Sequence, residues 1–386
     1  MRIGLFTDSY APQVSGVVTV VRVLKAELER LGHKVYIFTV SHKEAAPDSN
    51  IIRVKSFQFP NEPQHRVGVF SNHEIIKKAK ECNLDIIHTH SEFSLYFAAK
   101  AVSQKLKIPM VHTLHTYYPD YLYYVPLFEP FLRNREYKLL KRVFKYHKCI
   151  IAPSRKIYNY LEKHNFSQPI KIIPNGIELK AFSAGQENSS PKALQAFREA
   201  YGIKPEEELV VFVGRLAIEK NIVTLLNNFK KMHDVMPKLK LLIAGDGPDR
   251  RDLLSYTKSL GLENSVLYLG YLNWPNEIST CYAASKLFMS ASHSEVHPIT
   301  FIEAMAAGLP VVCAQDVSIQ DMVLNGENGF AVEDDTKLWE KALEILADPV
   351  KQVSMGKRSA ELSANYSVKT FVERMTKLYE EYALHK

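Results

Sequence analysis

Short strand-like runs alternate with longer helical patterns along the whole chain, beginning with the largely apolar run at residues 2–7. A helical pattern over residues 17–31 ends at Gly32, and the next β-branched run follows at once. Strands joined through helices form right-handed crossovers, which place neighbouring strands parallel and cover both faces of the sheet. The order predicts an α/β fold with parallel sheets. The predicted strands are residues 2–7, 34–40, 85–88, 110–113, 149–152, 170–173, 209–213, 239–244, 266–269, 287–290 and 310–313.

The alternation is interrupted once, near the middle of the chain. Pro174-Asn175-Gly176 and a polar stretch at 183–191 precede the restart at residue 209. Because 386 residues exceed what one hydrophobic core usually supports, we expect a domain joint between about 175 and 205. Two Rossmann-like, doubly wound domains should face each other across a cleft, with ligands at the carboxyl ends of the strands. The predicted domains are 1–178 and 179–365, with a helix at 366–386 that packs back on the first.

Composition and charge exclude several classes of protein. The chain is 46% hydrophobic and 24% charged, which is typical of a folded protein, and no window has the roughly 18 apolar residues of a membrane-spanning helix. The N-terminal run resembles a first strand and lacks the features of a signal peptide. Four scattered cysteines without zinc-site spacing predict buried, reduced thiols in a cytoplasmic protein. The net charge of +7 is concentrated between Arg133 and Lys148, and no nucleic-acid-binding module accompanies it.

The strongest local signal lies between Ser294 and Val312. Pro298 can open a helix there, which leaves the backbone amides near Ile299 and Thr300 available to an anion. Glu295 precedes this helix and Glu303 lies inside it, so both carboxylates can face one ligand and accept hydrogen bonds from a diol. Two isolated glutamates would ordinarily be a helix cap and part of a solvated face.

A second cluster follows the strand at 209–213. Gly214 ends that strand, and Arg215 and Lys220 occupy the loop at the carboxyl edge of the sheet. Two cations in this position can stabilise a departing diphosphate. The ordinary alternative is a pair of solvated loop cations.

These motifs together resemble those of the retaining glycosyltransferases of family 4, which have the GT-B fold. The two glutamates have seven residues between them and precede Ala-Met-Ala-Ala-Gly-Leu-Pro-Val-Val, as in the Glu-x7-Glu signature, and Gly-Arg-Leu is followed closely by Glu-Lys-Asn. The resemblance implies that Arg215 and Lys220 bind pyrophosphate, Glu295 the hexose and Glu303 the ribose. Gly16 resembles the glycine loop over the donor phosphate, and the glycine spacing there argues against a dinucleotide oxidoreductase.

Residues 111–124 resemble one group of enzymes within this family. The pattern His-Thr-x-Tyr-x-Asp-Tyr-x-x-Tyr is similar to that of diacylglycerol glycosyltransferases within the family. It implies that His115 contacts the transferred sugar and that Asp120, Tyr117 and Tyr121 lie near the acceptor hydroxyl. A lone histidine is more often a core or surface residue than a catalytic one.

A basic helical pattern follows at 130–148. One side carries Phe131, Leu132, Arg135, Leu139, Val143 and Tyr146, and another gathers cations. Such a helix suits an anionic membrane surface, whereas a packed helix with a solvated charged face is the alternative. The predicted membrane residues are Arg133, Lys138, Lys141, Arg142, Lys145 and Lys148.

The expected reaction is transfer of an α-hexosyl group from UDP-galactose or UDP-glucose to diacylglycerol or a similar lipid alcohol such as a sterol. It would take place at the cytoplasmic leaflet, with the second domain holding the nucleotide sugar. His297-Pro298 replaces a glycine that many relatives carry, which leaves the hexose open and slightly favours galactose. No suitably placed Asp-x-Asp motif occurs, so we expect no obligatory metal, and anionic phospholipid as a stimulant. The rivals are a soluble or glycan acceptor, and a nucleotide-sugar-binding or membrane scaffold without turnover.

Overall fold

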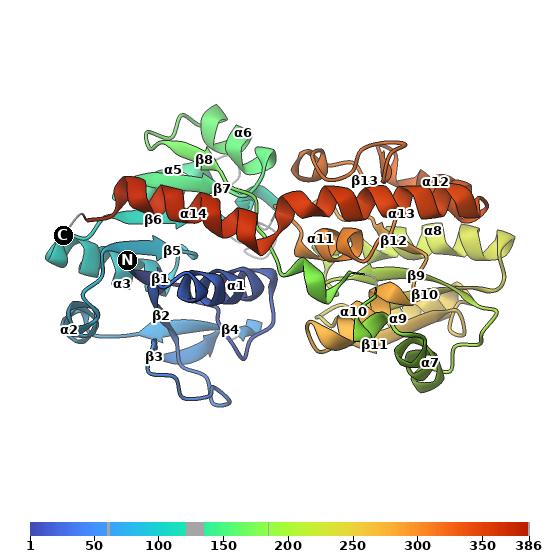
Figure 1. Ribbon diagram of the computed structural model, residues 1–386, viewed down its shortest axis with the longest axis horizontal. Coiled ribbons are helices and arrows are strands. Elements are labelled where there is room, and N and C mark those ends of the chain that lie inside the picture. The colour runs from blue at the N-terminus through green and yellow to red at the C-terminus, as the bar shows by residue number, and fades with distance from the viewer. Residues whose placement is uncertain (60–61, 121–134, 184, 385–386) are drawn as a thin grey trace. The chain divides into compact units, whose positions relative to one another are not determined.

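The computed structural model describes residues 1–59, 62–120, 135–183 and 185–384 (Figure 1). Contacts divide the chain into two compact units. Unit 1 comprises Met1–Ile177 together with Val368–Lys386, and unit 2 comprises Glu178–Ser367. The chain thus leaves unit 1 once and returns to it for its last helix.

Unit 1 is built on one eight-stranded sheet with the order β4-β3-β2-β1-β5-β6-β7-β8. Every neighbouring pair is parallel except β3 and β4. Its strands are β1 (Arg2–Phe6), β2 (Lys34–Val40), β3 (Ile51–Phe59), β4 (Glu62–Val69), β5 (Ile86–Thr89), β6 (Met110–Thr113), β7 (Cys149–Ala152) and β8 (Ile170–Ile172). Its helices include α1 (Gly16–Arg30), α2 (Asn72–Cys82), α3 (Ser94–Leu106), α5 (Glu136–Phe144), α6 (Arg155–Lys163) and α14 (Val368–Tyr382).

The strand order of unit 1 reverses between β1 and β5. Right-handed crossovers in opposite directions from this point place α1 and α3 on opposite faces of the sheet. Buried residues of α2 and α3 form one core cluster with the sheet, while α14 packs against α1. In such folds ligands bind outside the carboxyl ends of the strands at the reversal, so the loops after β1 and β5 are the positions to inspect.

Unit 2 repeats this plan with a six-stranded parallel sheet of order β11-β10-β9-β12-β13-β14. The reversal lies between β9 and β12. The strands are β9 (Glu208–Val213), β10 (Leu239–Ala244), β11 (Val266–Gly270), β12 (Leu287–Ser290), β13 (Val311–Ala314) and β14 (Gly329–Val332). The helices are α7 (Pro191–Ala200), α8 (Ile222–Val235), α9 (Arg250–Ser259), α10 (Asn276–Ala283), α11 (Ile299–Ala306), α12 (Leu338–Leu346) and α13 (Pro349–Ser363).

All eleven predicted strands are present, but the structure contains three more, β3, β4 and β14. The expectation of an entirely parallel sheet is wrong at one edge, because β4 runs antiparallel to β3. A proline and several polar residues make β4 unlike a central strand, and an edge strand tolerates both. The four residues of β14 are too few to show a periodicity.

The ends of the chain and the cysteines also have defined surroundings. The last helix, α14, buries Phe371, Met375 and Tyr379, and the Leu384 amide donates to the Asp85 carbonyl 3.1 Å away. All four cysteines are free and buried, as expected. Within the described ranges no helix is both long and apolar enough to cross a membrane.

Candidate active site

The loop after β9 approaches the loop after β10 through two glycines. Gly245 has a φ of +131°, and a Cβ atom built on it would lie 1.9 Å from the Gly214 carbonyl oxygen. Only a residue without a side chain fits this contact. The two loops therefore meet backbone to backbone, which fixes where the chain leaves β9 toward Arg215.

Lys220 and Glu295 meet at the reversal point of unit 2. Lys220 follows β9 and Glu295 follows β12, and the Lys220 ammonium donates to the Glu295 carboxylate across 2.6 Å. Their side chains are only 17% and 14% exposed. A guanidinium nitrogen of Arg215 lies 3.9 Å from the Glu219 carboxylate in the same loop. The structure thus brings Lys220, which is predicted to bind phosphate, into direct contact with Glu295, which is predicted to bind the hexose. Arg215 lies in the same loop as Lys220.

The helix α11 begins at Ile299, so Pro298 is its N-cap rather than its first helical residue. Pro298 has no side-chain oxygen that could cap the helix, and the first backbone amides belong to Ile299 and Thr300. The positive end of the helix and these amides can accept an anion. Ile299 is buried and Thr300 is half-buried.

Glu303 lies inside unit 2 and has two protein donors. Its carboxylate accepts hydrogen bonds from Trp274 Nε1 at 2.7 Å and from the Tyr282 hydroxyl at 3.0 Å. The residue is 3% exposed, and burial raises the pKa of its carboxyl to about 7 although both hydrogen bonds oppose the rise. Glu295 and Glu303 therefore have separate sets of partners.

His297 is a packing residue in this structure. Its ring meets the ring of Tyr366 edge-on at 5.3 Å, and the Tyr366 hydroxyl donates to the Asp321 carbonyl. Burial lowers the pKa of His297 to about 3. The imidazole is therefore neutral and fills space beside the loop that carries Glu295.

In unit 1, His115 belongs to a network of histidines at the ends of β5 and β6. His115 Nε2 lies 3.0 Å from His90 Nδ1, and burial together with nearby His112 lowers the pKa of His115 to about 4. His112 Nε2 lies 2.9 Å from a Glu92 oxygen, and the Tyr118 hydroxyl donates to the other Glu92 oxygen. His115 is therefore a neutral side chain in a hydrogen-bonded cluster.

The predicted acceptor residues of unit 1 are joined by a lysine. The Lys156 ammonium donates to Asp120 at 3.2 Å and lies 4.8 Å from the centre of the Tyr117 ring. Tyr121 lies outside the described residues. Gly16 is the first residue of α1 and is exposed, next to the N-cap Ser15.

In the described residues the predicted basic helix is shorter than expected. In the described part, α5 spans Glu136–Phe144 and buries Glu136, Leu140 and Phe144, while Leu139 is 48% exposed. Leu139, on the predicted apolar side, is turned outward, because the neighbouring Leu140 faces the core. Four of the predicted cations are exposed, Lys141 is half-buried, and Arg133 lies outside the described residues. The exposed cations are Lys138, Arg142, Lys145 and Lys148.

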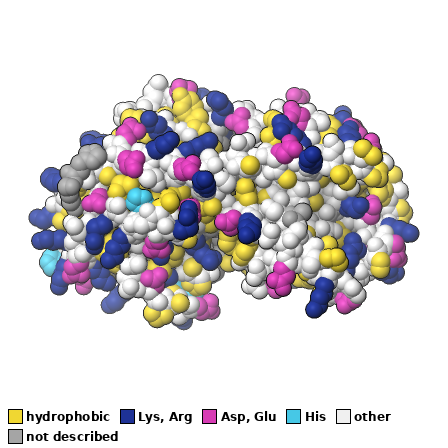
Figure 2. Space-filling model, in the orientation of Figure 1, with side chains coloured by type: hydrophobic (Ala, Val, Ile, Leu, Met, Phe, Trp, Pro, Cys, Tyr) yellow, Lys and Arg dark blue, Asp and Glu magenta, His cyan; other side chains and the backbone are white. Residues whose placement is uncertain are grey.

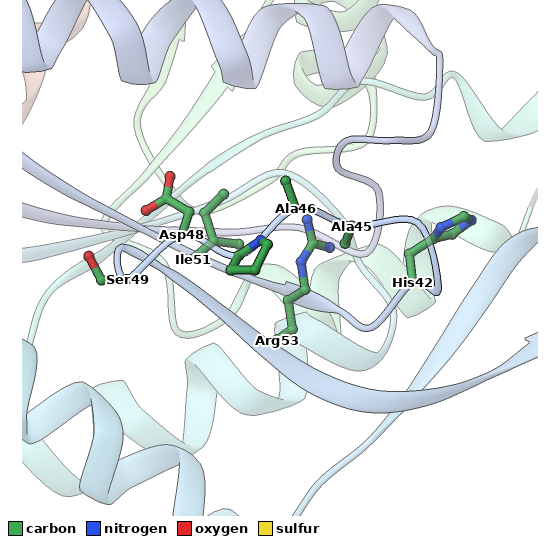
Figure 3. A pocket seen from close by; sticks show the side chains of 8 residues that line it. His42, Ala45, Ala46, Asp48, Ser49, Ile51 and Arg53 are labelled. Atoms are coloured by element: carbon green, nitrogen blue, oxygen red, sulfur yellow. The ribbon is translucent and has the colours of Figure 1, made fainter.

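Two surface pockets lie away from every predicted site residue. One, of about 470 Å³, is lined by the loop after β2 and by Arg53 (Figure 3). The guanidinium of Arg53 donates to the carbonyls of Val40 and Ala11, which holds it against the backbone. The other, of about 610 Å³, follows β13 in unit 2 and includes Gln315 and Glu327. Neither arrangement shows a set of groups that converge on a ligand.

Sequence reasoning missed Trp274, Lys156 and most of the histidine network. His88-Thr89-His90 at the end of a predicted strand was a usable signal, because polar residues at a strand's carboxyl end face the ligand edge. Trp274 and Lys156 had no such signal, since each is identified only by the residue that it contacts.

Comparison with known proteins matches the chain to two family models. The model of Glycosyltransferase Family 4 matches residues 14–181, and that of Glycosyl transferases group 1 matches residues 195–362. The alpha-monoglucosyldiacylglycerol synthase of Streptococcus pneumoniae is 35% identical over 372 residues, which cover 94% of this chain and 83% of that protein. The synthase of the same name from Acholeplasma laidlawii is 31% identical, with coverages of 98% and 96%.

A solved structure supports the fold. Sucrose-phosphate synthase from Thermosynechococcus elongatus superposes with a TM-score of 0.77 at 22% identity, over 99% of each chain. Together with the two strand orders, this confirms the predicted fold class, an α/β GT-B fold with two parallel-sheet domains.

Proposed function

Because the chain belongs to glycosyltransferase family 4, we propose that it transfers a glucosyl group from UDP-glucose to the hydroxyl of 1,2-diacylglycerol and retains the α configuration. The observation that carries the proposed chemistry is the Lys220–Glu295 contact, with Arg215 in the same loop, at the carboxyl edge of the unit 2 sheet. Support for the acceptor and the sugar comes from the names of the two synthases, which match nearly the whole chain.

The proposed roles follow from charge and from hydrogen-bonding capacity. Arg215 and Lys220 stabilise the negative charge that grows on the departing diphosphate, and the amides of Ile299 and Thr300 add the positive end of α11. The backbone at Gly214 and Gly16 approaches the donor closely because neither residue has a side chain. A carboxylate accepts two hydrogen bonds from a diol, which suits Glu303 to the ribose and Glu295 to the hexose.

In the proposed reaction the acceptor oxygen attacks the anomeric carbon from the side on which the diphosphate leaves. The bond from that carbon to the phosphate oxygen breaks, the new glycosidic bond forms, and the acceptor proton passes to the departing phosphate oxygen. His115 contacts the transferred hexose, and Asp120 and Tyr117 contact the acceptor. Because its pKa is lowered, His115 is a weak base, and the phosphate oxygen takes the proton of the acceptor hydroxyl.

An assay of UDP release tests the donor and the acceptor together. Purified protein is given UDP-glucose or UDP-galactose, with diacylglycerol in anionic vesicles, in neutral vesicles, or with no acceptor. We expect release from UDP-glucose that depends on diacylglycerol. Release from UDP-galactose alone would identify the other hexose, which His297-Pro298 slightly favours. Further arms contain a sterol or a soluble acceptor in place of diacylglycerol. Release only in those arms, or no release at all, would reject the diacylglycerol proposal.

We further propose that a surface of unit 1, the aromatic–basic surface, binds anionic lipid. It consists of Phe93, Phe97 and Lys100 around the start of α3, Tyr146, and the exposed cations Lys138, Arg142, Lys145 and Lys148. Phe93 and Phe97 are 63% and 57% exposed. The Lys100 ammonium lies 4.4 Å from the centre of the Tyr146 ring, and this contact connects α3 to the residues that follow α5. On the face drawn in Figure 2, basic and acidic side chains are interspersed.

Two sets of variants test this surface by vesicle sedimentation. Replacing Arg142 and Lys145 by glutamate should weaken binding to anionic vesicles by about tenfold or more, because each cation near such a surface contributes about 1 kcal/mol. Replacing Phe93 and Phe97 by serine should weaken binding even at high salt, since burial of apolar area is not screened.

The matched control for the aromatic pair is in unit 2. Val350 and Val353 are 80% and 69% exposed on α13, and their replacement by serine should leave vesicle binding unchanged. If the phenylalanine and valine variants behave alike, the aromatic side chains do not enter the lipid.

A further inference from the structure

His90 and His115 share one hydrogen bond in unit 1. His90 follows β5 and is 3% exposed, and its Nδ1 lies 3.0 Å from Nε2 of the half-buried His115. The two rings are close to parallel, with an interplanar angle of 21°. One ring nitrogen must donate and the other must accept, so this bond decides where each imidazole carries its proton.

The second nitrogen of His90 settles the direction of the bond. His90 Nε2 is buried and has no hydrogen-bond partner among the residues that the structure describes. Burial lowers the pKa of His90 well below its ordinary value, so this ring carries one proton near neutral pH. A proton on Nε2 would be a buried donor without an acceptor, which is costly, whereas a proton on Nδ1 is used in the bond to His115. His90 Nδ1 is therefore the donor and His115 Nε2 the acceptor.

We infer that His90 holds His115 in the tautomer with its proton on Nδ1, so that His115 offers an N–H donor to a hydroxyl of the transferred sugar. The part that concerns the sugar rests on the proposed function. His90 is in this view a positioning residue, while His115 contacts the substrate. The Nε2 lone pair of His115 already accepts the hydrogen bond from His90, so it cannot also take the proton of the diacylglycerol hydroxyl. This agrees with transfer of that proton to the departing phosphate.

The ring of His90 is itself held by a neighbour. The centres of the His88 and His90 rings are 3.9 Å apart, and His88 is fixed at both nitrogens. Its Nδ1 lies 2.7 Å from the Tyr379 hydroxyl of α14, and its Nε2 lies 2.7 Å from Thr113 Oγ1. The last helix of the chain thus supports the orientation of His90, although 291 positions separate Tyr379 from His88.

The direct test is the tautomer of His115 in the wild-type protein, read from two-bond proton–nitrogen correlations after histidine-selective 15N labelling. The spectrum of His115→Ala assigns the signals. We expect protonation at Nδ1 and a protonated neighbour at His90 Nδ1. A proton on His115 Nε2, or a doubly protonated ring near neutral pH, would overturn the inference. Since no substrate is present, this measurement is independent of the proposed reaction.

Two substitutions connect the tautomer to turnover. His90→Asn keeps an N–H donor at the same distance from Cβ, so the His115 tautomer and kcat should be largely retained. His90→Leu removes the donor, and kcat should fall about tenfold or more with a smaller change in KM. Equal kcat values in the two variants would contradict the positioning role.

A buried histidine outside this bond provides the control. His147 Nε2 contacts Thr89 Oγ1, and His147→Leu should lower the melting temperature while the His115 tautomer remains unchanged. If the wild type shows the expected tautomer but no transfer to diacylglycerol, the proposed function fails and the assignment of the proton stands.

Discussion

Lys220→Ala is expected to lower kcat/KM for glucosyl transfer by about 10²-fold or more, because it removes one of two cations placed to stabilise the departing diphosphate. The ammonium group lies 2.6 Å from Glu295 and is largely buried, so its charge is poorly screened by solvent. The effect should persist at saturating acceptor, since the charge develops on the donor. Steady-state UDP release with both donors measures it.

A matched lysine separates this effect from a general loss of charge. Lys230 pairs with Asp234 on the exposed side of α8, and Lys230→Ala should leave turnover within about twofold of wild type. Melting temperatures of both variants establish that each is folded. Near-normal turnover by folded Lys220→Ala would remove Lys220 from the proposed machinery.

Glu303→Ala is expected to weaken UDP binding by about 10²-fold, because hydrogen bonds to a charged group contribute about 1.5–3 kcal/mol each. The substitution also leaves Trp274 Nε1 and the Tyr282 hydroxyl without their acceptor, so the melting temperature should fall. Isothermal titration calorimetry with UDP gives the affinity, and the melting temperature shows how far the substitution destabilises the fold.

The raised pKa of Glu303 adds a pH dependence of defined sign. With a pKa of about 7, the carboxylate form that accepts ribose hydroxyls is lost as pH falls through 7. UDP affinity should therefore drop by about tenfold between about pH 8 and about pH 6.

The isosteric variant Glu303→Gln isolates that dependence. It cannot titrate, whereas the phosphate of UDP titrates equally in both proteins. A pH profile that is identical for wild type and Glu303→Gln would show that Glu303 does not act through its charge.

Local sequence was sufficient for eleven of the fourteen described strands and for the positions of the donor motifs. Alternating β-branched and helical segments are set by side-chain periodicity within a few residues, and all eleven strands predicted in this way exist. Gly214, Arg215 and Lys220 follow β9 as expected, because a strand that ends in glycine and a short polar loop is a local pattern. The edge strand β4 lacked such a pattern, since it carries a proline and several polar residues.

The helix α5 shows where periodicity is insufficient. Leu139, Leu140, Val143 and Phe144 place apolar side chains over one broad side of the helix, so the sequence permits either edge of that side to face the sheet. Packing against the sheet selected Leu140 and Phe144 and left Leu139 outward. Neither residue type nor spacing distinguishes the two choices.

From the sequence alone came the α/β class, the division near the middle of the chain, and the order of motifs that identifies the family. Only the tertiary structure decided which of these side chains touch: Lys220 with Glu295, Glu303 with Trp274, and His115 with His90. Strand order brings loops that are distant in the chain to the same edge of a sheet, and burial there requires each polar group to find a partner. The residues that pair in this way are 25 to 75 positions apart, so no local sequence pattern could predict which of them make contact.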